Sequence, residues 1–110
     1  MKHIINGDME EKMAKNMWSL LPLEAIELSV EAFTYGAKKY KPDNWREYTS
    51  NVFIDAMGRH MLKIYQGEEC DEESGLSHLG HYLADCMMYV GLKMKEIEEE
   101  KNGKPDSKLQ

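Results

Sequence analysis

Residues 76–98, LSHLGHYLADCMMYVGLKMKEIE, are the stretch that decides the fold class. Apolar side chains recur in it at three- and four-residue steps, the period of an α-helix, and cover a wide arc of the helix surface. These side chains are Leu79, Leu83, Cys86, Met87, Val90, Met94 and Ile97. Gly80, Ala84 and Gly91 form a strip of small residues, suited to close approach of a neighbouring helix or of a second subunit. The segment is therefore predicted to be the central helix of a bundle.

Two more long helices are predicted before it. The first covers residues 22–40, because Pro22 suits a first helical turn, where its missing N–H costs nothing. Its apolar stripe consists of Leu23, Ile26, Val30, Phe33, Ala37 and Tyr40. The second begins near residues 49–51, where three good capping residues stand together, and ends at Gly67. Its inward side carries Phe53, Ala56, Met57, Met61 and Ile64.

The expected fold is all-α, because the sequence contains no alternating apolar and polar run long enough for a convincing strand. We expect a small bundle of three main helices plus a short N-terminal helix over residues 10–18. Three helices enclose a site poorly, so we expect oligomerisation to complete the fold. Residues 1–97 are predicted to form one helical nucleotide-binding domain, and residues 98–110, which lack an apolar face, a flexible charged tail.

Composition excludes several classes of protein. The chain has 110 residues, the size of one domain, and its formal net charge of −6 disfavours binding to duplex nucleic acid through phosphates. No apolar run reaches the roughly 18 residues of a membrane span, and the start, MKHIINGDMEEK, lacks the apolar stretch of a signal peptide. Two cysteines without metal-ligand spacing are typical of reduced thiols. We expect a cytoplasmic protein with neither duplex nucleic acid nor a membrane as partner.

Three histidines are predicted to face the interior. His78, His81 and Asp85 lie within roughly 60° on one face of the central helix, since helical rotation is about 100° per residue. His60 lies in the apolar arc of the preceding helix, between two methionines. Buried imidazoles and carboxylates need partners, so these groups either pair with one another structurally or line a pocket that binds a metal, a phosphate or a base.

Two further groups of polar residues accompany the histidines. Glu24, Glu27 and Glu31 stack on one face of the first helix, either as a solvated surface or opposite cations. A cationic and aromatic group comprises Lys38, Lys39, Tyr40, Lys41, Asn44, Trp45, Arg46 and Arg59. Lysine and arginine can hold phosphates and an aromatic face can stack a base, although the same residues can simply end a helix and anchor a loop. Together the three groups are what a nucleotide pocket in a helical bundle requires.

Three segments resemble a phage-encoded family. They are LLPLEAIELSVEAFTYGAKKYKPDNW at residues 20–45, GRHMLKIYQGE at residues 58–68 and DEESGLSHLGHYLADC at residues 71–86. The family is the N-terminal region of dATP/dGTP diphosphohydrolases, MazZ-like relatives of the all-α MazG nucleotide pyrophosphatases. The resemblance implies hydrolysis of a purine deoxynucleoside triphosphate to monophosphate and pyrophosphate with Mg²⁺ or Mn²⁺. It also implies a helical homo-oligomer in the cytoplasm of a host cell.

The metal ligands depart from the MazG pattern, which is Glu-Glu-x-x-Glu on one helix and Glu-x-x-Asp on the next. Asp85 fits the end of the second motif, but Tyr82 stands at its glutamate, and the preceding helix carries no acidic triplet. The expected metal ligands are Glu24, Glu27 and Asp85. The expected catalytic residues are Glu27, Asp85 and His81. The expected nucleotide-binding residues are Lys38, Lys39, Tyr40, Asn44, Trp45, Arg59, His60 and His78, and the histidines are either further metal ligands or neutral groups of the pocket.

Three hypotheses follow for the function. The first is a metal-dependent diphosphohydrolase of dGTP, dATP or a related purine nucleotide. The second is a protein that binds and sequesters such a nucleotide in the same pocket without cleaving it, which the incomplete acidic motif favours. The third is a helical interaction protein without a small ligand, whose histidines and Asp85 only pair with one another.

Overall fold

The computed structural model describes residues 15–103, and that part of the chain is all-α, as predicted. The elements are η1 (Trp18–Leu20), α2 (Leu23–Lys39), η2 (Asn44–Glu47), α3 (Val52–Tyr65) and α4 (His78–Lys101). Extended pairing is confined, among the described residues, to one isolated bridge between Cys70 and Ser77. None of the described helices is long and apolar enough to span a membrane.

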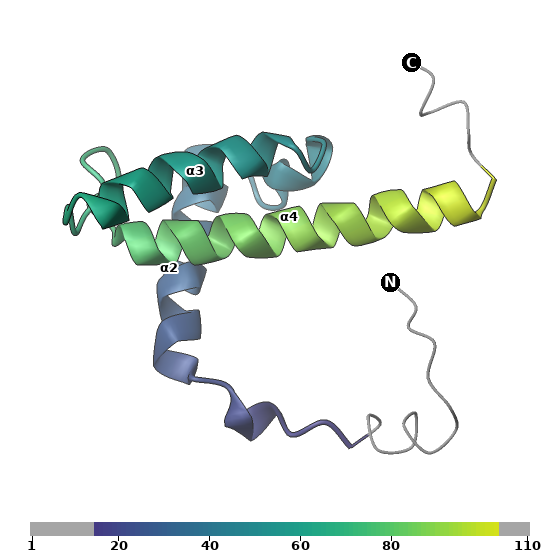
Figure 1. The fold of residues 1–110 in the computed structure, drawn as a ribbon, viewed down its shortest axis with the longest axis horizontal. Helices are drawn as coiled ribbons and strands as arrows, with labels where there is room; N and C mark the ends of the chain where they lie inside the picture. Colours follow the sequence, from purple (N-terminus) through teal and green to yellow (C-terminus); the bar gives the residue numbers. More distant parts are fainter. Residues whose placement is uncertain (1–14, 104–110) are drawn as a thin grey trace.

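α4 is the element against which the other two long helices pack (Figure 1). α3 runs along the N-terminal half of α4, whereas α2 crosses α4 steeply on another side. The long C-terminal half of α4 extends beyond both partners. The apolar core is correspondingly small, with Ala32, Phe53, Ala84 and Leu92 as its buried members. The prediction that residues 76–98 form the central helix is confirmed.

The small residues of α4 make contacts within the chain. A Cβ added at Gly80 would lie 2.5 Å from the backbone oxygen of Leu28, so α2 crosses α4 where no side chain separates the two backbones. A Cβ added at Gly91 would lie 3.2 Å from the Trp45 ring, so the neighbour there is the indole of η2 and not a helix. The strip of small residues was predicted to contact either a neighbouring helix or a second subunit. At Gly80 and Gly91 it contacts residues of the same chain.

The buried faces of α2 and α4 differ from the predicted stripes. On α2, Leu23, Val30 and Tyr40 are exposed, while Ser29 and Ala32 are buried. On α4, four of the predicted apolar positions are exposed, namely Leu79, Met87, Val90 and Met94. The physical reason is the steep crossing, because two helices that cross at an angle bury only the short stretch around the crossing point and leave the rest of each apolar stripe uncovered.

The ends of the helices depart from prediction in three places. The helix predicted over residues 10–18 lies mostly outside the described residues, and its described end shows only the single 3₁₀ turn η1. Pro22 precedes α2 as its N-cap and is not a helical residue. α4 continues to Lys101, into the predicted flexible tail of residues 98–110, because extending a formed helix adds a hydrogen bond for each residue fixed. Gly67 follows α3 with φ of +84°, as its predicted helix-ending role requires.

Candidate functional site

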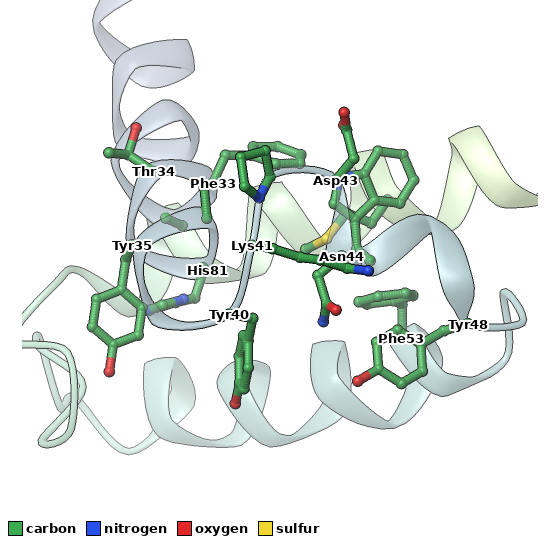
Figure 2. Close-up of a pocket in the computed structure, with 16 residues that line it drawn as sticks. Phe33, Thr34, Tyr35, Tyr40, Lys41, Asp43, Asn44, Tyr48, Phe53 and His81 are labelled. Atoms are coloured by element: carbon green, nitrogen blue, oxygen red, sulfur yellow. The ribbon is translucent and has the colours of Figure 1, made fainter.

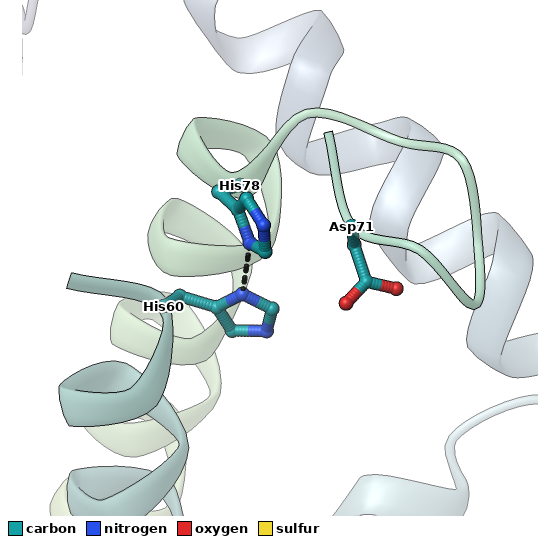
Figure 3. Close-up of side chains that lie close together, drawn as sticks. All are labelled: His60, Asp71 and His78. Carbon is teal, nitrogen blue, oxygen red and sulfur yellow. Dashed lines mark hydrogen bonds between the residues drawn. The ribbon is translucent and has the colours of Figure 1, made fainter. Parts of the chain in front are cut away.

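The three histidines predicted to face inward meet at one end of the bundle, and Figure 3 shows two of them, His60 and His78, facing each other. Nδ1 of His60 on α3 lies 2.8 Å from Nδ1 of His78 on α4. The His60 ring also stacks on the ring of His81, with centroids 4.8 Å apart and planes 5° from parallel. His78 is 2% exposed, and the other two are half-buried. The helical spacing therefore places imidazoles from two helices in one cluster.

Glu68 binds the more buried of the two hydrogen-bonded rings. Its Oε2 lies 2.7 Å from Nε2 of His78, so this carboxylate accepts a hydrogen bond from Nε2–H. Nδ1 of His78 is left to form the hydrogen bond with Nδ1 of His60. The hydrogen bond with His78 also lowers the pKa of Glu68, which keeps the carboxylate ionised.

Asp71 and Ser74 complete the cluster from the loop between α3 and α4. Oδ2 of Asp71 accepts hydrogen bonds from the Ser74 amide at 2.8 Å and from the Ser74 hydroxyl at 3.0 Å. The same hydroxyl oxygen lies 2.7 Å from Nε2 of His81. Because its own proton is donated to Asp71, this oxygen accepts a hydrogen bond from Nε2–H of His81. Asp71 is thereby linked to His81 through one serine. We call the set His60, Glu68, Asp71, Ser74, His78 and His81 the histidine cluster.

Burial controls the charge of this cluster. Burial, followed by repulsion from His81 and His78, lowers the pKa of His60. Burial likewise lowers the pKa of His81, although Asp71 opposes the shift. Burial raises the pKa of Asp71, but the hydrogen bonds from Ser74 outweigh it and the net direction is down. At neutral pH the cluster therefore combines neutral His60 and His81 rings with ionised carboxylates.

The loop residues of this cluster were not among the predicted site residues. Glu68, Asp71 and Ser74 stand in an acidic loop, which has no hydrophobic period that would reveal which side chains point inward. The turn at Gly75, with φ of +75°, lets the chain fold back so that the Asp71 amide donates to the Leu76 carbonyl at 2.8 Å. The available signal was a serine and a glycine directly after a carboxylate-rich run.

Three ligand atoms of the cluster lie close enough to share one ion. One atom each from His60, Asp71 and His78 lies within 4.8 Å of the other two, a property that no other set of three described His, Cys, Asp or Glu residues has. The predicted metal set of Glu24, Glu27 and Asp85 is therefore not assembled within one chain. Glu24 and Glu27 are exposed on α2, whereas Asp85 is buried on α4.

Asp85 is the most unusual carboxylate of the described chain. It is 7% exposed, and its Oδ2 atom has no hydrogen-bond partner there. Burial raises its pKa from the ordinary 3.8 to about 7, and the positive charge of Arg59 offsets only part of this shift. The hydrogen bond between a histidine and Asp85 that a purely structural role would supply is absent from the described contacts. Asp85 is therefore poised between its protonated and ionised forms near neutral pH.

An apolar cavity of about 500 Å³ adjoins the histidine cluster (Figure 2). The end of α2, the η2 turn, the start of α3 and the middle of α4 supply its walls. Its lining includes Tyr40, Asn44, Trp45, Tyr48, Phe53 and His81. The left-handed backbone of Asp43, with φ of 62°, turns the chain so that Trp45 packs against Phe33 with ring centroids 6.1 Å apart. Tyr40, Asn44 and Trp45, all predicted nucleotide-binding residues, therefore share one cavity.

His81 connects the cavity to the histidine cluster. It lines the cavity, stacks on His60 and is bound by Ser74. Tyr35 of α2 packs against it edge to face, with centroids 6.3 Å apart, and is itself part of the cavity wall. A molecule in the cavity would therefore contact a ring that is also bound to His60 and Ser74 of the cluster.

The predicted cationic residues divide between several places. Lys39 forms an ion pair with Glu73, which also accepts a hydrogen bond from the Tyr35 hydroxyl at 2.9 Å. Lys38 lines a second cavity of about 390 Å³, together with Glu27 and Ser74. Arg59 is exposed on α3, and the alternative pairing with Asp55 is not among the described ion pairs. The cations therefore surround the aromatic cavity and the histidine cluster but do not form one compact patch.

Comparison with known proteins identifies the family. Residues 6–102 match the family model described as "dATP/dGTP diphosphohydrolase, N-terminal". A "dATP/dGTP diphosphohydrolase" of Salmonella phage PMBT28 is 29% identical over 72 residues, which make up 66% of this chain and 24% of that relative. The chain thus spans about a quarter of the length of the curated relative it matches. No solved structure matches the chain. Because the family model covers nearly the whole sequence, this chain belongs to the dATP/dGTP diphosphohydrolase N-terminal family.

Proposed function

We propose that the chain binds a purine deoxynucleoside triphosphate and hydrolyses it to the monophosphate and pyrophosphate. The family and the name of the phage relative support this reaction class. The observation that carries the proposal is the position of His81, which is at once a wall of the aromatic cavity and a member of the histidine cluster. A base held in the cavity would place its phosphates beside groups that can bind, orient and exchange protons.

The aromatic cavity suits a purine base. About 500 Å³ lies within the range of small-molecule sites, and the walls combine aromatic rings with few polar groups, as such sites usually do. Trp45 and Tyr40 offer faces for stacking, and the Asn44 amide offers both a donor and an acceptor to a base edge. Figure 2 shows Tyr40 and Asn44 projecting to the same side of the chain that links α2 to η2. We assign base recognition to these three residues.

The triphosphate would then lie toward the histidine cluster. Arg59 and Lys38 are exposed cations on the helices that flank this end, and neither has a described ion pair. They can offset charge on phosphoryl oxygens as those oxygens become more negative. His81, with Nε2–H directed at Ser74, is held in one tautomer, so its Nδ1 lone pair can accept a proton from a water near the phosphates.

A Mg²⁺ site of three carboxylates does not fit the single chain. The unpartnered Oδ2 of Asp85 is the kind of atom that a cation would satisfy, but Glu24 and Glu27 do not reach it. In the proposed reaction Asp85 and Glu27 therefore act from separate positions on α4 and α2.

Product analysis with the full chain tests the reaction. The protein is incubated with dGTP, dATP, dCTP or dTTP and Mg²⁺ or Mn²⁺, and the products are resolved by anion-exchange chromatography. We expect monophosphate and pyrophosphate in equal amounts from at least one purine substrate. Absence of pyrophosphate from every triphosphate, with a folded protein, would contradict the proposed reaction.

A pair of tryptophan variants tests the binding site separately. Trp45→Ala removes a stacking face worth about 1–3 kcal/mol, so we expect nucleotide affinity to fall roughly 5- to 150-fold. Trp18→Ala is the matched control, because Trp18 is 74% exposed on η1 and lies outside the cavity lining. If calorimetry gives the two variants equal affinities for the nucleotide, the base does not bind in this cavity.

The second candidate function is nucleotide sequestration without hydrolysis. The failure of the carboxylate set to assemble in the chain specifically favours it. Mass spectrometry of the ligand released after denaturation separates the two functions. A sequestering protein returns the intact triphosphate, whereas a diphosphohydrolase returns the monophosphate.

A further inference from the structure

We propose that His60, His78 and Asp71 form a binding site for a divalent transition-metal ion. Two imidazole nitrogens and one carboxylate oxygen are the donors, and they come from α3, α4 and the loop between them (Figure 3). The site deepens the proposed function, on which its link to a reaction rests, but the binding itself needs no nucleotide.

The distances within the site are close to those that one ion requires. The two Nδ1 atoms are 2.8 Å apart. Two nitrogens at right angles, each about 2.1 Å from a metal, lie about 3.0 Å from each other. One nitrogen of each ring and one carboxylate oxygen of Asp71 all lie within 4.8 Å of one another. Small side-chain shifts therefore convert the hydrogen-bonded cluster into a coordinating one.

The hydrogen bonds of the ligands also suit coordination. Glu68 binds Nε2–H of His78 at 2.7 Å, which leaves Nδ1 of that ring to face the site. Each ring coordinates through Nδ1 in the tautomer that carries its proton on Nε2. One Asp71 oxygen, Oδ2, is held by Ser74, and no hydrogen bond to Oδ1 is recorded within residues 15–103.

Groups outside the three ligands hold two of them in place. Glu68 orients His78, and the amide and hydroxyl of Ser74 orient Asp71. Such partners of ligating side chains are a regular feature of metal sites, where they fix ring orientation and raise ligand basicity.

The donor set selects the class of ion. Mg²⁺ and Ca²⁺ prefer all-oxygen surroundings, whereas two imidazoles and a carboxylate suit Mn²⁺, Fe²⁺, Co²⁺ or Zn²⁺. Three protein ligands leave coordination positions open, as catalytic metal sites do. His81, which stacks on the His60 ligand, also lines the aromatic cavity. A phosphate oxygen of a nucleotide bound there could complete the coordination.

Titration of the chelator-treated full chain with Co²⁺, in the absence of nucleotide, tests the site. We expect one Co²⁺ per chain by calorimetry, visible d–d absorption without a thiolate charge-transfer band, and much weaker binding of Mg²⁺. A thiolate band would assign the ion to a cysteine and overturn the proposal. No binding of Co²⁺ by the folded protein would overturn it as well.

Variants identify the ligands. Asp71→Asn and His60→Ala should abolish stoichiometric binding, and Glu68→Gln should weaken it about 10- to 100-fold. Glu72→Gln, a change to an exposed carboxylate of the same loop, is the matched control and should leave the affinity unchanged. Circular dichroism establishes that each variant is folded.

Co²⁺ binding that survives Asp71→Asn and His60→Ala would overturn the proposal. Loss of Co²⁺ binding in a Glu24→Gln/Glu27→Gln double variant would overturn it as well. Because no nucleotide is present, these experiments can refute the metal site without refuting hydrolysis. Product analysis can likewise refute hydrolysis without refuting the metal site.

Discussion

Replacement of Asp85 by asparagine should change the pH dependence of stability in a defined direction. The unfolded chain releases the Asp85 proton near pH 3.8, whereas the folded chain keeps it until about pH 7. Between these values the folded state binds the extra proton, so the contribution of Asp85 to stability falls as pH rises through this window and is constant above it. Asparagine carries no titrating proton and removes this dependence.

The magnitude follows from the two pKa values. A tenfold change in proton affinity is worth about 1.4 kcal/mol, so the difference between 3.8 and about 7 corresponds to about 4 kcal/mol. This is a large share of the 5–15 kcal/mol by which folded domains are typically stable. Asp85 is 7% exposed, so solvent screening reduces the figure little. We therefore expect the stability of wild type relative to Asp85→Asn to fall by about 4 kcal/mol from pH 4 to pH 8.

Urea unfolding of both proteins across this pH range, in chelator and without nucleotide, measures the difference. The comparison is needed because His60 and His81, whose pKa values are lowered, make stability rise with pH up to about 6.5, the opposite direction. These contributions are common to both proteins and cancel. Asp55→Asn, the same change on the exposed side of α3, is the control. A stability difference for Asp85→Asn that stays flat with pH, like that of the control, would refute the assignment of a raised pKa.

Three further outcomes are expected. Gly80→Ala should destabilise the fold by about 1–3 kcal/mol, because the new Cβ would lie 2.5 Å from the Leu28 oxygen; chemical denaturation that shows no loss would contradict the close crossing. Gly58→Ala, on α3 with open space around it, should instead stabilise by about 0.5–1 kcal/mol, and a loss measured in the same assay would count against that reading. Light scattering should show a homo-oligomer, because the exposed apolar side chains of Met87 and Val90 lie on one side of α4. Val90→Glu should shift the oligomer toward monomer, and a wild-type protein that stays monomeric at high concentration would contradict this prediction.

The inward histidines were predictable because they occupy helical positions. The three- and four-residue spacing of His78 and His81, and the place of His60 among apolar residues, determine where each side chain points from its own helix axis. Their partners could not be predicted in the same way. Glu68 and Asp71 reach the histidines from a loop, and a loop has no period that relates sequence position to direction.

The predicted carboxylate set did not assemble for a related reason. Glu24 and Glu27 were joined to Asp85 through the resemblance to MazG-like enzymes, whose acidic residues stand on consecutive helices. Here the acidic stripe lies on α2, which crosses α4 steeply, while α3 runs alongside α4 and brings His60. The helix next to Asp85 thus supplies an imidazole and a guanidinium in place of carboxylates.

The amino-acid sequence by itself determined the helical class, the central position of residues 76–98 and the inward direction of the histidines. These properties depend on the period of side chains around a single helix, which local spacing specifies. Only the tertiary structure decided which faces of α2 and α4 are buried, that Oδ2 of Asp85 has no hydrogen-bond partner within residues 15–103, and that loop carboxylates join the histidine cluster. Those outcomes depend on where helices cross and how loops close over them, and both are set by contacts between residues far apart in the chain.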